Sequence, residues 1–153
     1  HVGQVPLAFP IMPSDANRGN AAAAGFLYPF GYGLSYTSFE YSDLSIDTST
    51  FSNSDKITVS FSVKNSGKVA GDEIAQLYFR DNMASVVVYE KELCGFDRVS
   101  LQPGETKKVS MEVDKETLSI VNSNLERVFE PGKFTIMIGN SSEDIRLEEV
   151  IEL

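Results

Sequence analysis

Alternation of apolar and polar residues is the clearest pattern in the chain, and it runs through much of residues 39–153. Residues 56–64 (KITVSFSVK) show it best, because four apolar residues there alternate with polar ones. A period of two places the apolar side chains on one face of a β-strand. The same pattern in residues 73–81, 106–114 and 133–139 predicts further strands of this kind.

Turn-forming residues separate these segments. Residues 65–67 (NSG), 102–105 (QPGE) and 130–133 (EPGK) are rich in Asn, Ser, Pro and Gly, which favour tight turns. Together with residues 92–101 and 145–153 these are six segments, and the β signal over residues 39–153 as a whole predicts about seven short strands. No long helical pattern interrupts them. This spacing predicts an all-β fold, an immunoglobulin-like antiparallel β-sandwich of two packed sheets.

Two local details refine this prediction. Asp114 is expected to cap a short helical turn over residues 115–120, because its carboxylate can accept hydrogen bonds from the exposed amides there. In the last strand the alternation slips at Glu148 and Glu149, which predicts a β-bulge at that point.

The first 25 residues differ in composition from the predicted sandwich. Residues 1–12 form a short apolar segment, which we interpret as a strand that is lone or at a sheet edge, because Pro6 and Pro10 cannot donate ladder hydrogen bonds. Residues 13–25 hold only small and polar side chains apart from Arg18, and we interpret them as a linker.

Residues 26–38 are dense in aromatic residues, and we name them the strap. Such a stretch needs a surface to pack against, in its own domain or a neighbouring one, so we expect it to serve in docking. A sugar-stacking platform is the alternative, but the chain has no Trp, and Pro and Gly interleave with the rings in a way that suits a buried strap. The residues expected to dock are Tyr28, Phe30, Tyr32, Leu34 and Tyr36.

The acidic charge balance argues against several classes of partner. The 153 residues include 13 Lys and Arg against 22 Asp and Glu, a net charge of −9. Binding to nucleic acid or to an anionic membrane surface needs clustered basic residues, so neither is expected. No apolar run is long enough for a transmembrane helix, so membrane insertion is not expected either.

The residue types needed for catalysis are scarce in this chain. The one histidine is His1 at the extreme end, which makes a Ser-His-Asp or Cys-His site improbable. The one cysteine, Cys94, lies in an apolar strand segment and is interpreted as a small buried residue rather than a reactive thiol. Glu90 and Glu92 are the one neighbouring acidic pair able to share a strand face, and a solvated acidic face is the better interpretation.

Ligand-binding patterns are weak as well. Calcium binding at residues 72–73 or 81–82 lacks a loop of spaced oxygen ligands, and nothing has the spacing of a zinc or nucleotide site. Asn140-Ser141-Ser142 fits the glycosylation tripeptide, although a turn explains it equally well. The sequence therefore predicts no catalytic residue, no cofactor and no metal site.

Four segments in order resemble one enzyme family. They are residues 28–44 (YPFGYGLSYTSFEYSDL), 66–81, 91–113 and 129–142, and they are similar to the C-terminal end of glycoside hydrolase family 3, which includes β-glucosidases and β-xylosidases. Residues 2–9 (VGQVPLAF) resemble the last strand of the α/β sandwich domain that precedes it in that family. The resemblance implies a fibronectin type III-like sandwich over residues 39–153, entered through the aromatic strap.

The resemblance also implies an accessory role. The family's nucleophile lies in a barrel domain and its acid/base residue usually lies in the α/β sandwich domain, so no catalytic residue carries over to this chain. The implied partners are those two domains of the parent enzyme, with an oligosaccharide near the parent's active site as a further contact. A periplasmic or extracellular location is favoured over a cytoplasmic one. The start at His1-Val2, without Met, is expected of a processed product or a fragment.

Two functions of other classes remain open from the sequence. An autonomous carbohydrate-binding module would bind soluble glucan or xylan measurably. A cell-surface adhesion sandwich would occur in tandem copies. The sequence upstream of His1 separates these hypotheses from that of an accessory domain of a β-glycosidase.

Overall fold

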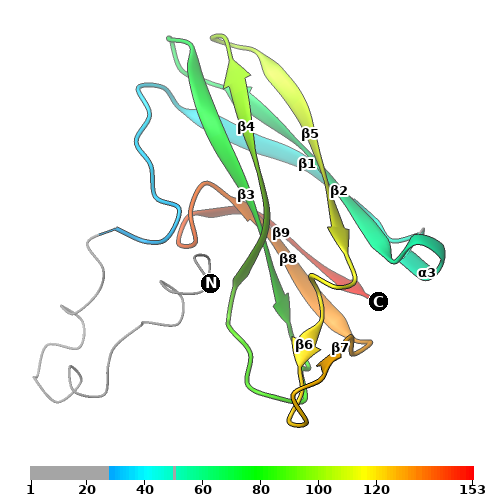
Figure 1. The fold of residues 1–153 in the computed structure, drawn as a ribbon. Coiled ribbons are helices and arrows are strands. Elements are labelled where there is room, and N and C mark those ends of the chain that lie inside the picture. The colour runs from blue at the N-terminus through cyan, green and yellow to red at the C-terminus, as the bar shows by residue number, and fades with distance from the viewer. Residues whose placement is uncertain (1–27, 50) are drawn as a thin grey trace, which may run out of the picture.

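The computed structural model describes residues 28–49 and 51–153. The expected terminal strand over residues 1–12 and the linker over residues 13–25 lie outside these residues. The described part is an antiparallel β-sandwich, as the sequence predicts, with two packed sheets and short connections (Figure 1).

One layer is a three-stranded sheet in the order β1-β2-β5. It contains β1 (Phe39–Asp47), β2 (Lys56–Asn65) and β5 (Thr106–Asp114). The four apolar residues predicted to face inward from β2 are completely buried: Ile57, Val59, Phe61 and Val63. Burying each of these side chains stabilises the fold by about 1.5–3 kcal/mol.

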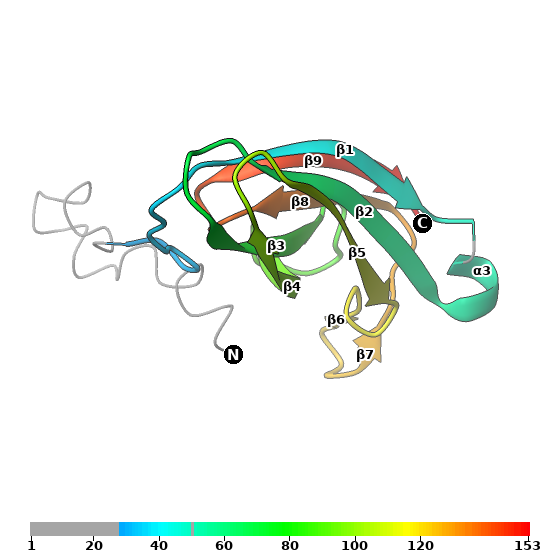
Figure 2. The same cartoon turned by 90° about the horizontal axis from the view of Figure 1, so that it is seen from above.

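The other layer is a four-stranded sheet in the order β4-β3-β8-β9. Its strands are β3 (Gly71–Asp81), β4 (Glu92–Leu101), β8 (Lys133–Gly139) and β9 (Ile145–Glu152). The view from above shows the two layers, with the edge strands β1 and β9 next to each other (Figure 2). Residues 75–79 of β3 are buried on both faces of the sheet, whereas Ile74 and Arg80 on its outer face are exposed.

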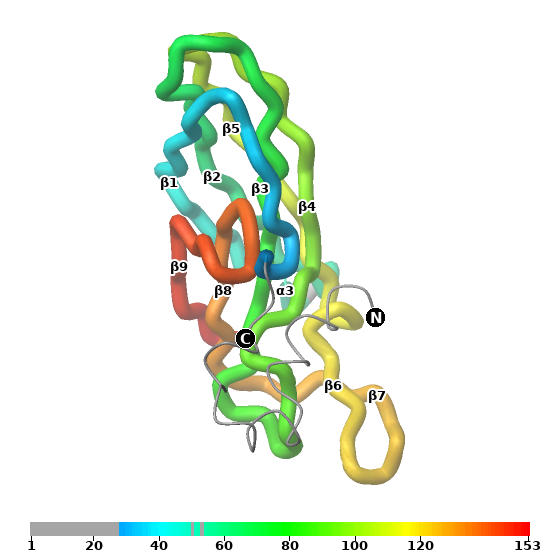
Figure 3. Tube along the Cα trace, turned by 90° about the vertical axis from the view of Figure 1, so that its left-hand side faces the viewer, coloured from blue at the N-terminus to red at the C-terminus, as the bar shows by residue number. Residues whose placement is uncertain are grey.

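Three short elements complete the described part. The helix α3 (Phe51–Ser54) precedes β2, and the two-residue strands β6 (Ile120–Val121) and β7 (Arg127–Val128) form a small hairpin at one end of the molecule (Figures 1 and 3). The described residues therefore contain nine strands rather than about seven. Strands of two residues are too short to show any alternation in the sequence.

The capping hydrogen bond of Asp114 is confirmed, but the turn covers residues 115–118 and Ile120 already belongs to β6. The predicted bulge is displaced. Asp114 Oδ1 accepts a hydrogen bond from the Thr117 amide at 2.8 Å, at the start of a turn. Glu148 and Glu149 pair in regular register with β8, so the prediction of a bulge there was wrong. Glu149 holds an inward register position opposite Ile136 but stays exposed, because β9 is an edge strand and the side chain reaches water past the edge.

The irregularity of β9 lies nearer its start. Ile145 pairs with Gly139 and Leu147 pairs with Ile138, so Arg146 is the extra residue between them. A bulge of this kind bends the strand and changes the direction of a side chain. It therefore helps to place Arg146 beside the cavity described below.

Candidate functional site

The strap is anchored to the outer face of the four-stranded sheet by one glutamine. Gln76 on β3 alternates with core residues and so points away from the core. Its Nε2 donates hydrogen bonds to the carbonyl oxygens of Gly31 at 3.0 Å and Asn140 at 2.5 Å. The Ser142 amide donates to the Phe30 carbonyl at 2.9 Å, and Figure 3 shows the strap passing beside the β8–β9 loop.

A tyrosine fixes the orientation of this glutamine. The Tyr78 hydroxyl, on the same face of β3, donates to Gln76 Oε1 at 2.6 Å. Tyr78 is completely buried, and burial raises the pKa of its phenol, so the hydroxyl remains a donor. With Oε1 accepting from Tyr78, the amide Nε2 is left to bind the two carbonyls. Sequence reasoning missed this anchor, because Gln76 sits at a position where alternation predicts only a polar surface residue.

The strap fits over Gln76 because Gly31 lacks a side chain. Gly31 has φ +79°, in the left-handed region that residues other than glycine rarely adopt. A Cβ atom there would overlap the side chain of Gln76. Gly33, by contrast, has open space where its Cβ would be.

Beyond this anchor, the strap turns large apolar side chains towards solvent. Tyr36 is fully exposed, and Leu34 is 88% exposed. The rings of Tyr28 and Tyr32 stack on each other, with centroids 4.8 Å apart, and both are largely exposed. Phe30 is half-buried. Four of the five residues expected to dock thus present apolar area that the described residues leave uncovered.

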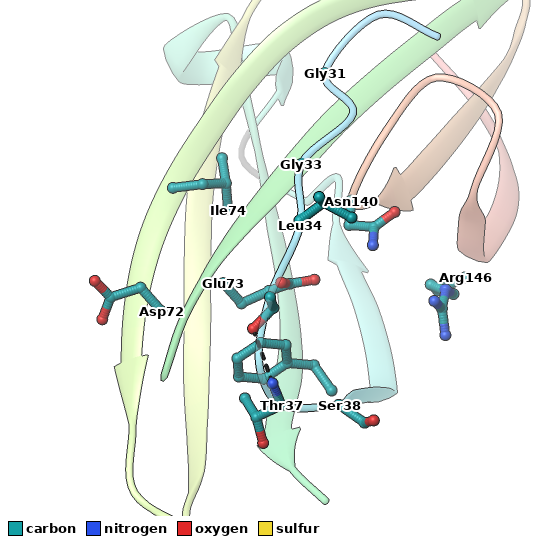
Figure 4. A pocket seen from close by; sticks show the side chains of 12 residues that line it. Gly31, Gly33, Leu34, Thr37, Ser38, Asp72, Glu73, Ile74, Asn140 and Arg146 are labelled. Atoms are coloured by element: carbon teal, nitrogen blue, oxygen red, sulfur yellow. Dashed lines mark hydrogen bonds between the residues drawn. The ribbon is translucent and has the colours of Figure 1, made fainter. Parts of the chain in front are cut away.

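A cavity of about 390 Å³ opens between the strap and the sheet. It lies where β3 extends past the end of β8, since β8 pairs with β3 only from Gln76 onward. Figure 4 shows strap residues along it, with Asp72 and Glu73 of β3, Asn140 and Arg146 around them. Its lining is mostly polar.

Glu73 is the most buried charged group of this cavity, with 7% of the residue exposed. Its Oε1 accepts a hydrogen bond from the Tyr41 hydroxyl of β1 at 2.8 Å, which links the two sheets. Burial raises the pKa of the Glu73 carboxyl, and the bond from Tyr41 and the charge of Arg146 oppose that shift. The pKa of Tyr41 is also raised, by burial first and then by the neighbouring charge of Glu73.

The arginines near Glu73 pair with other carboxylates. Arg146 Nε lies 2.6 Å from Asp144 Oδ1, and Arg146 Nη2 donates a hydrogen bond to Asp144 Oδ2 at 2.7 Å. Arg98 Nε donates to Asp72 Oδ2 at 3.0 Å. Both arrangements leave the guanidinium groups engaged with a carboxylate other than Glu73.

The other residues considered in the sequence as candidates for chemistry occupy ordinary structural positions. Burial raises the pKa of the Cys94 thiol to about 12, and its Sγ donates to the Leu77 carbonyl at 3.4 Å, so it is no ready nucleophile. Glu90 is exposed, whereas Glu92 at the start of β4 is half-buried. The Asn140 carbonyl accepts from Gln76, and Ser141 and Ser142 are buried in the turn that follows.

Residues 28–49 and 51–153 contain neither a metal-binding cluster nor a membrane-spanning helix. These residues include no group of three or more His, Cys, Asp or Glu side chains that could hold a metal ion. They include no helix with the length and apolar character needed to cross a membrane.

Comparison with known proteins identifies the fold family. A family model described as a fibronectin type III-like domain matches residues 73–142. A β-xylosidase from Formosa agariphila is 44% identical over 153 residues, spanning 97% of this chain and 21% of the enzyme. The chain contains a fibronectin type III-like domain that matches the C-terminal region of β-glucosidases and β-xylosidases of glycoside hydrolase family 3.

Further relatives agree with this assignment. Thermostable β-glucosidase B from Acetivibrio thermocellus is 49% identical to this fibronectin type III-like domain over 128 residues, or 83% of the chain and 17% of the enzyme. The solved structure of β-glucosidase 3B from Thermotoga neapolitana, in complex with α-D-glucose, superposes with a TM-score of 0.76 at 34% identity. That match covers 82% of this chain and 17% of the enzyme.

The fibronectin type III-like domain is thus a small part of its relatives. The chain spans about a fifth of the length of the curated enzymes it matches. The family model includes Glu73, Gln76 and Asn140, whereas the strap precedes the matched residues.

Proposed function

We propose that this chain is a non-catalytic accessory domain of a β-glycosidase, an enzyme that hydrolyses O-glycosidic bonds of β-glucosides or β-xylosides. The proposal rests on one observation: nearly the whole chain is similar to a segment that makes up about a fifth of the length of such an enzyme. The catalytic barrel and the α/β sandwich domain of the parent are its partners, and the domain stabilises them or shapes the approach to the active site.

The acidic groups of the main cavity support a non-catalytic role. Glycoside hydrolysis needs two facing carboxyl groups, one as acid and one as nucleophile or base. Around this cavity, Asp72 pairs with Arg98 and Asp144 pairs with Arg146. Glu73 is bound by Tyr41. These roles hold the fold together rather than leaving two carboxyls free for a sugar.

The strap supports docking against the catalytic domains. Leu34 and Tyr36 are exposed, yet the strap behind them is fixed by the hydrogen bonds from Gln76 and Ser142. Apolar side chains on a fixed backbone lose little further conformational entropy when a partner covers them. Covering a fully exposed large apolar side chain contributes about 1.5–3 kcal/mol.

The catalytic part of the proposal is tested with the purified chain. The chain should fold, with a β-type circular dichroism spectrum, and should hydrolyse neither a nitrophenyl β-glucoside nor a nitrophenyl β-xyloside. The parent enzyme assayed in parallel is the positive control. Turnover by the pure chain that survives repeated purification contradicts the proposal.

A further inference from the structure

We infer that the cavity at Glu73 receives a basic side chain, an arginine or lysine, from the part of the full-length enzyme that this domain docks against. The inference rests on the proposed docking function and names its electrostatic anchor. It follows from the burial and hydrogen bonding of the Glu73 carboxylate and from the pairing of the charged side chains around it.

Glu73 is a buried residue, and one of its two carboxylate oxygens is hydrogen-bonded within the domain. Oε1 accepts from Tyr41. No buried side-chain oxygen or nitrogen of the described residues lacks a hydrogen-bond partner, so Oε2, for which these residues supply no donor, has accessible surface. Glu73 lines the cavity, so a group from outside the domain reaches its carboxylate through the cavity. Burial penalises its charged form, and a cation placed against it would remove that penalty.

The charge of Arg146 favours the ionised form of Glu73, but neither nearby arginine pairs with this carboxylate directly. Arg146 lines the same cavity, but its guanidinium is held by two contacts to Asp144. Arg98 is held by Asp72. Each of these two pairs has no net charge. The negative charge of Glu73 therefore remains without a paired cation, and one positive charge from a partner would complement it.

The position of the cavity fits an anchor for docking. Leu34 of the strap lines it, and so do the backbones of Gly31 and Gly33. A surface that covers the exposed side chains of the strap would therefore close the mouth of the cavity. A guanidinium or ammonium group on that surface would then pair with Glu73 out of water, where charge-assisted hydrogen bonds are strong.

The test uses the opposite effects expected of Glu73→Gln in two settings. In the isolated chain, the amide oxygen of the new Gln side chain still accepts the hydrogen bond from Tyr41, and the substitution removes a buried charge. The urea concentration at the midpoint of unfolding at pH 7 should therefore rise. In the full-length enzyme the same change leaves the partner's cation buried without its anion, which is strongly destabilising. Docking should weaken, and hydroxyl-radical modification of Tyr36 should become faster by about tenfold or more.

A matched control is Glu112→Gln, which neutralises an exposed carboxylate on β5 and should leave Tyr36 modification unchanged. The inference is wrong if Tyr36 is protected in the wild-type full-length enzyme and Glu73→Gln leaves that protection intact, although docking itself would then stand. If Tyr36 is equally reactive in the isolated chain and the full-length enzyme, the docking proposal fails instead.

Two other occupants are tested directly. Glucose, xylose and Ca²⁺ are titrated into the isolated chain while amide shifts are followed by NMR. We expect no saturable shifts at residues 72–74, 140 and 146. Saturable shifts confined to these residues would assign the cavity to a sugar or a metal ion and overturn the inference.

Discussion

Single residues determine the path of the strap backbone, and Gly31 is the clearest example. Its positive φ and its contact with Gln76 both exclude a side chain. Gly31→Ala should lower the free energy of unfolding by at least about 1 kcal/mol, because the left-handed conformation alone costs a residue with a Cβ that much. Urea unfolding of the isolated chain measures the change.

Gly33→Ala is the matched control for this prediction. Gly33 lies two residues further along the strap and has open space around its Cβ position, and its φ is not positive. Its replacement should leave the unfolding free energy within about 0.5 kcal/mol of the wild type. Equal losses for the two variants would mean that Gly31 is not held over Gln76.

The buried carboxyl of Glu73 gives a pH dependence of defined sign. Its pKa is raised in the folded state, so between the unfolded pKa and the folded pKa the native chain holds the extra proton. The contribution of Glu73 to stability is therefore present at acid pH and is lost as the pH rises through the folded pKa. Tyr41, Arg146 and Asp144 are the titratable groups that act on it.

The difference between wild type and Glu73→Gln isolates this contribution from the other carboxylates. Several exposed acids, such as Asp72 and Asp114, have lowered pKa values because of their hydrogen bonds, and they destabilise both proteins alike at low pH. The stability advantage of the Gln variant should grow from pH 4 to pH 7 in urea titrations. An advantage that shrinks over this range contradicts a raised pKa.

At the scale of whole elements, alternation in the sequence was a reliable guide. β5 and β8 begin and end where alternation predicted, because their inward residues pack directly into the core. The bounds predicted for β4 are also confirmed, although its sequence shows no clear alternation. The sequence could not reveal the bulge at Arg146 or the short strands β6 and β7. Those features arise from pairing partners that are distant along the chain, or from hydrogen bonds of a single turn.

The β6–β7 hairpin contains a residue in an unfavourable conformation. Leu125 has φ +64° and is 86% exposed at the tip, where Asn122 Oδ1 accepts from the amides of Asn124 and Glu126. Asn tolerates the left-handed region better than Leu does. Leu125→Asn should therefore raise the free energy of unfolding by about 1 kcal/mol, measured by urea titration.

The control for the hairpin is Leu34→Asn, which replaces another exposed leucine, one whose φ is not positive. It should leave the stability of the isolated chain nearly unchanged. A loss of stability in Leu125→Asn would show that the leucine side chain makes a packing contribution greater than the cost of its backbone conformation.

At the scale of the whole molecule, the described residues pack around a well-formed core and leave the apolar side chains of the strap exposed. The aromatic content of the strap was evident in the sequence, and so was the expectation of docking. The sequence did not reveal that Gln76 anchors the strap or that the carboxylate of Glu73 is buried beside it. Both features depend on contacts between residues more than 30 positions apart. The strap is held in place by its own domain and presents Leu34 and Tyr36 outward.

Hydroxyl-radical footprinting of Leu34 and Tyr36, in the isolated chain and in the full-length enzyme, tests the accessory-domain account most directly. Both side chains should react freely in the isolated chain and about tenfold more slowly in the full-length enzyme, since burial of this area stabilises the docked state by more than 1.4 kcal/mol. Exposed Val87, on the loop between β3 and β4, serves as the internal reference. Equal reaction rates in the two proteins would contradict docking through the strap.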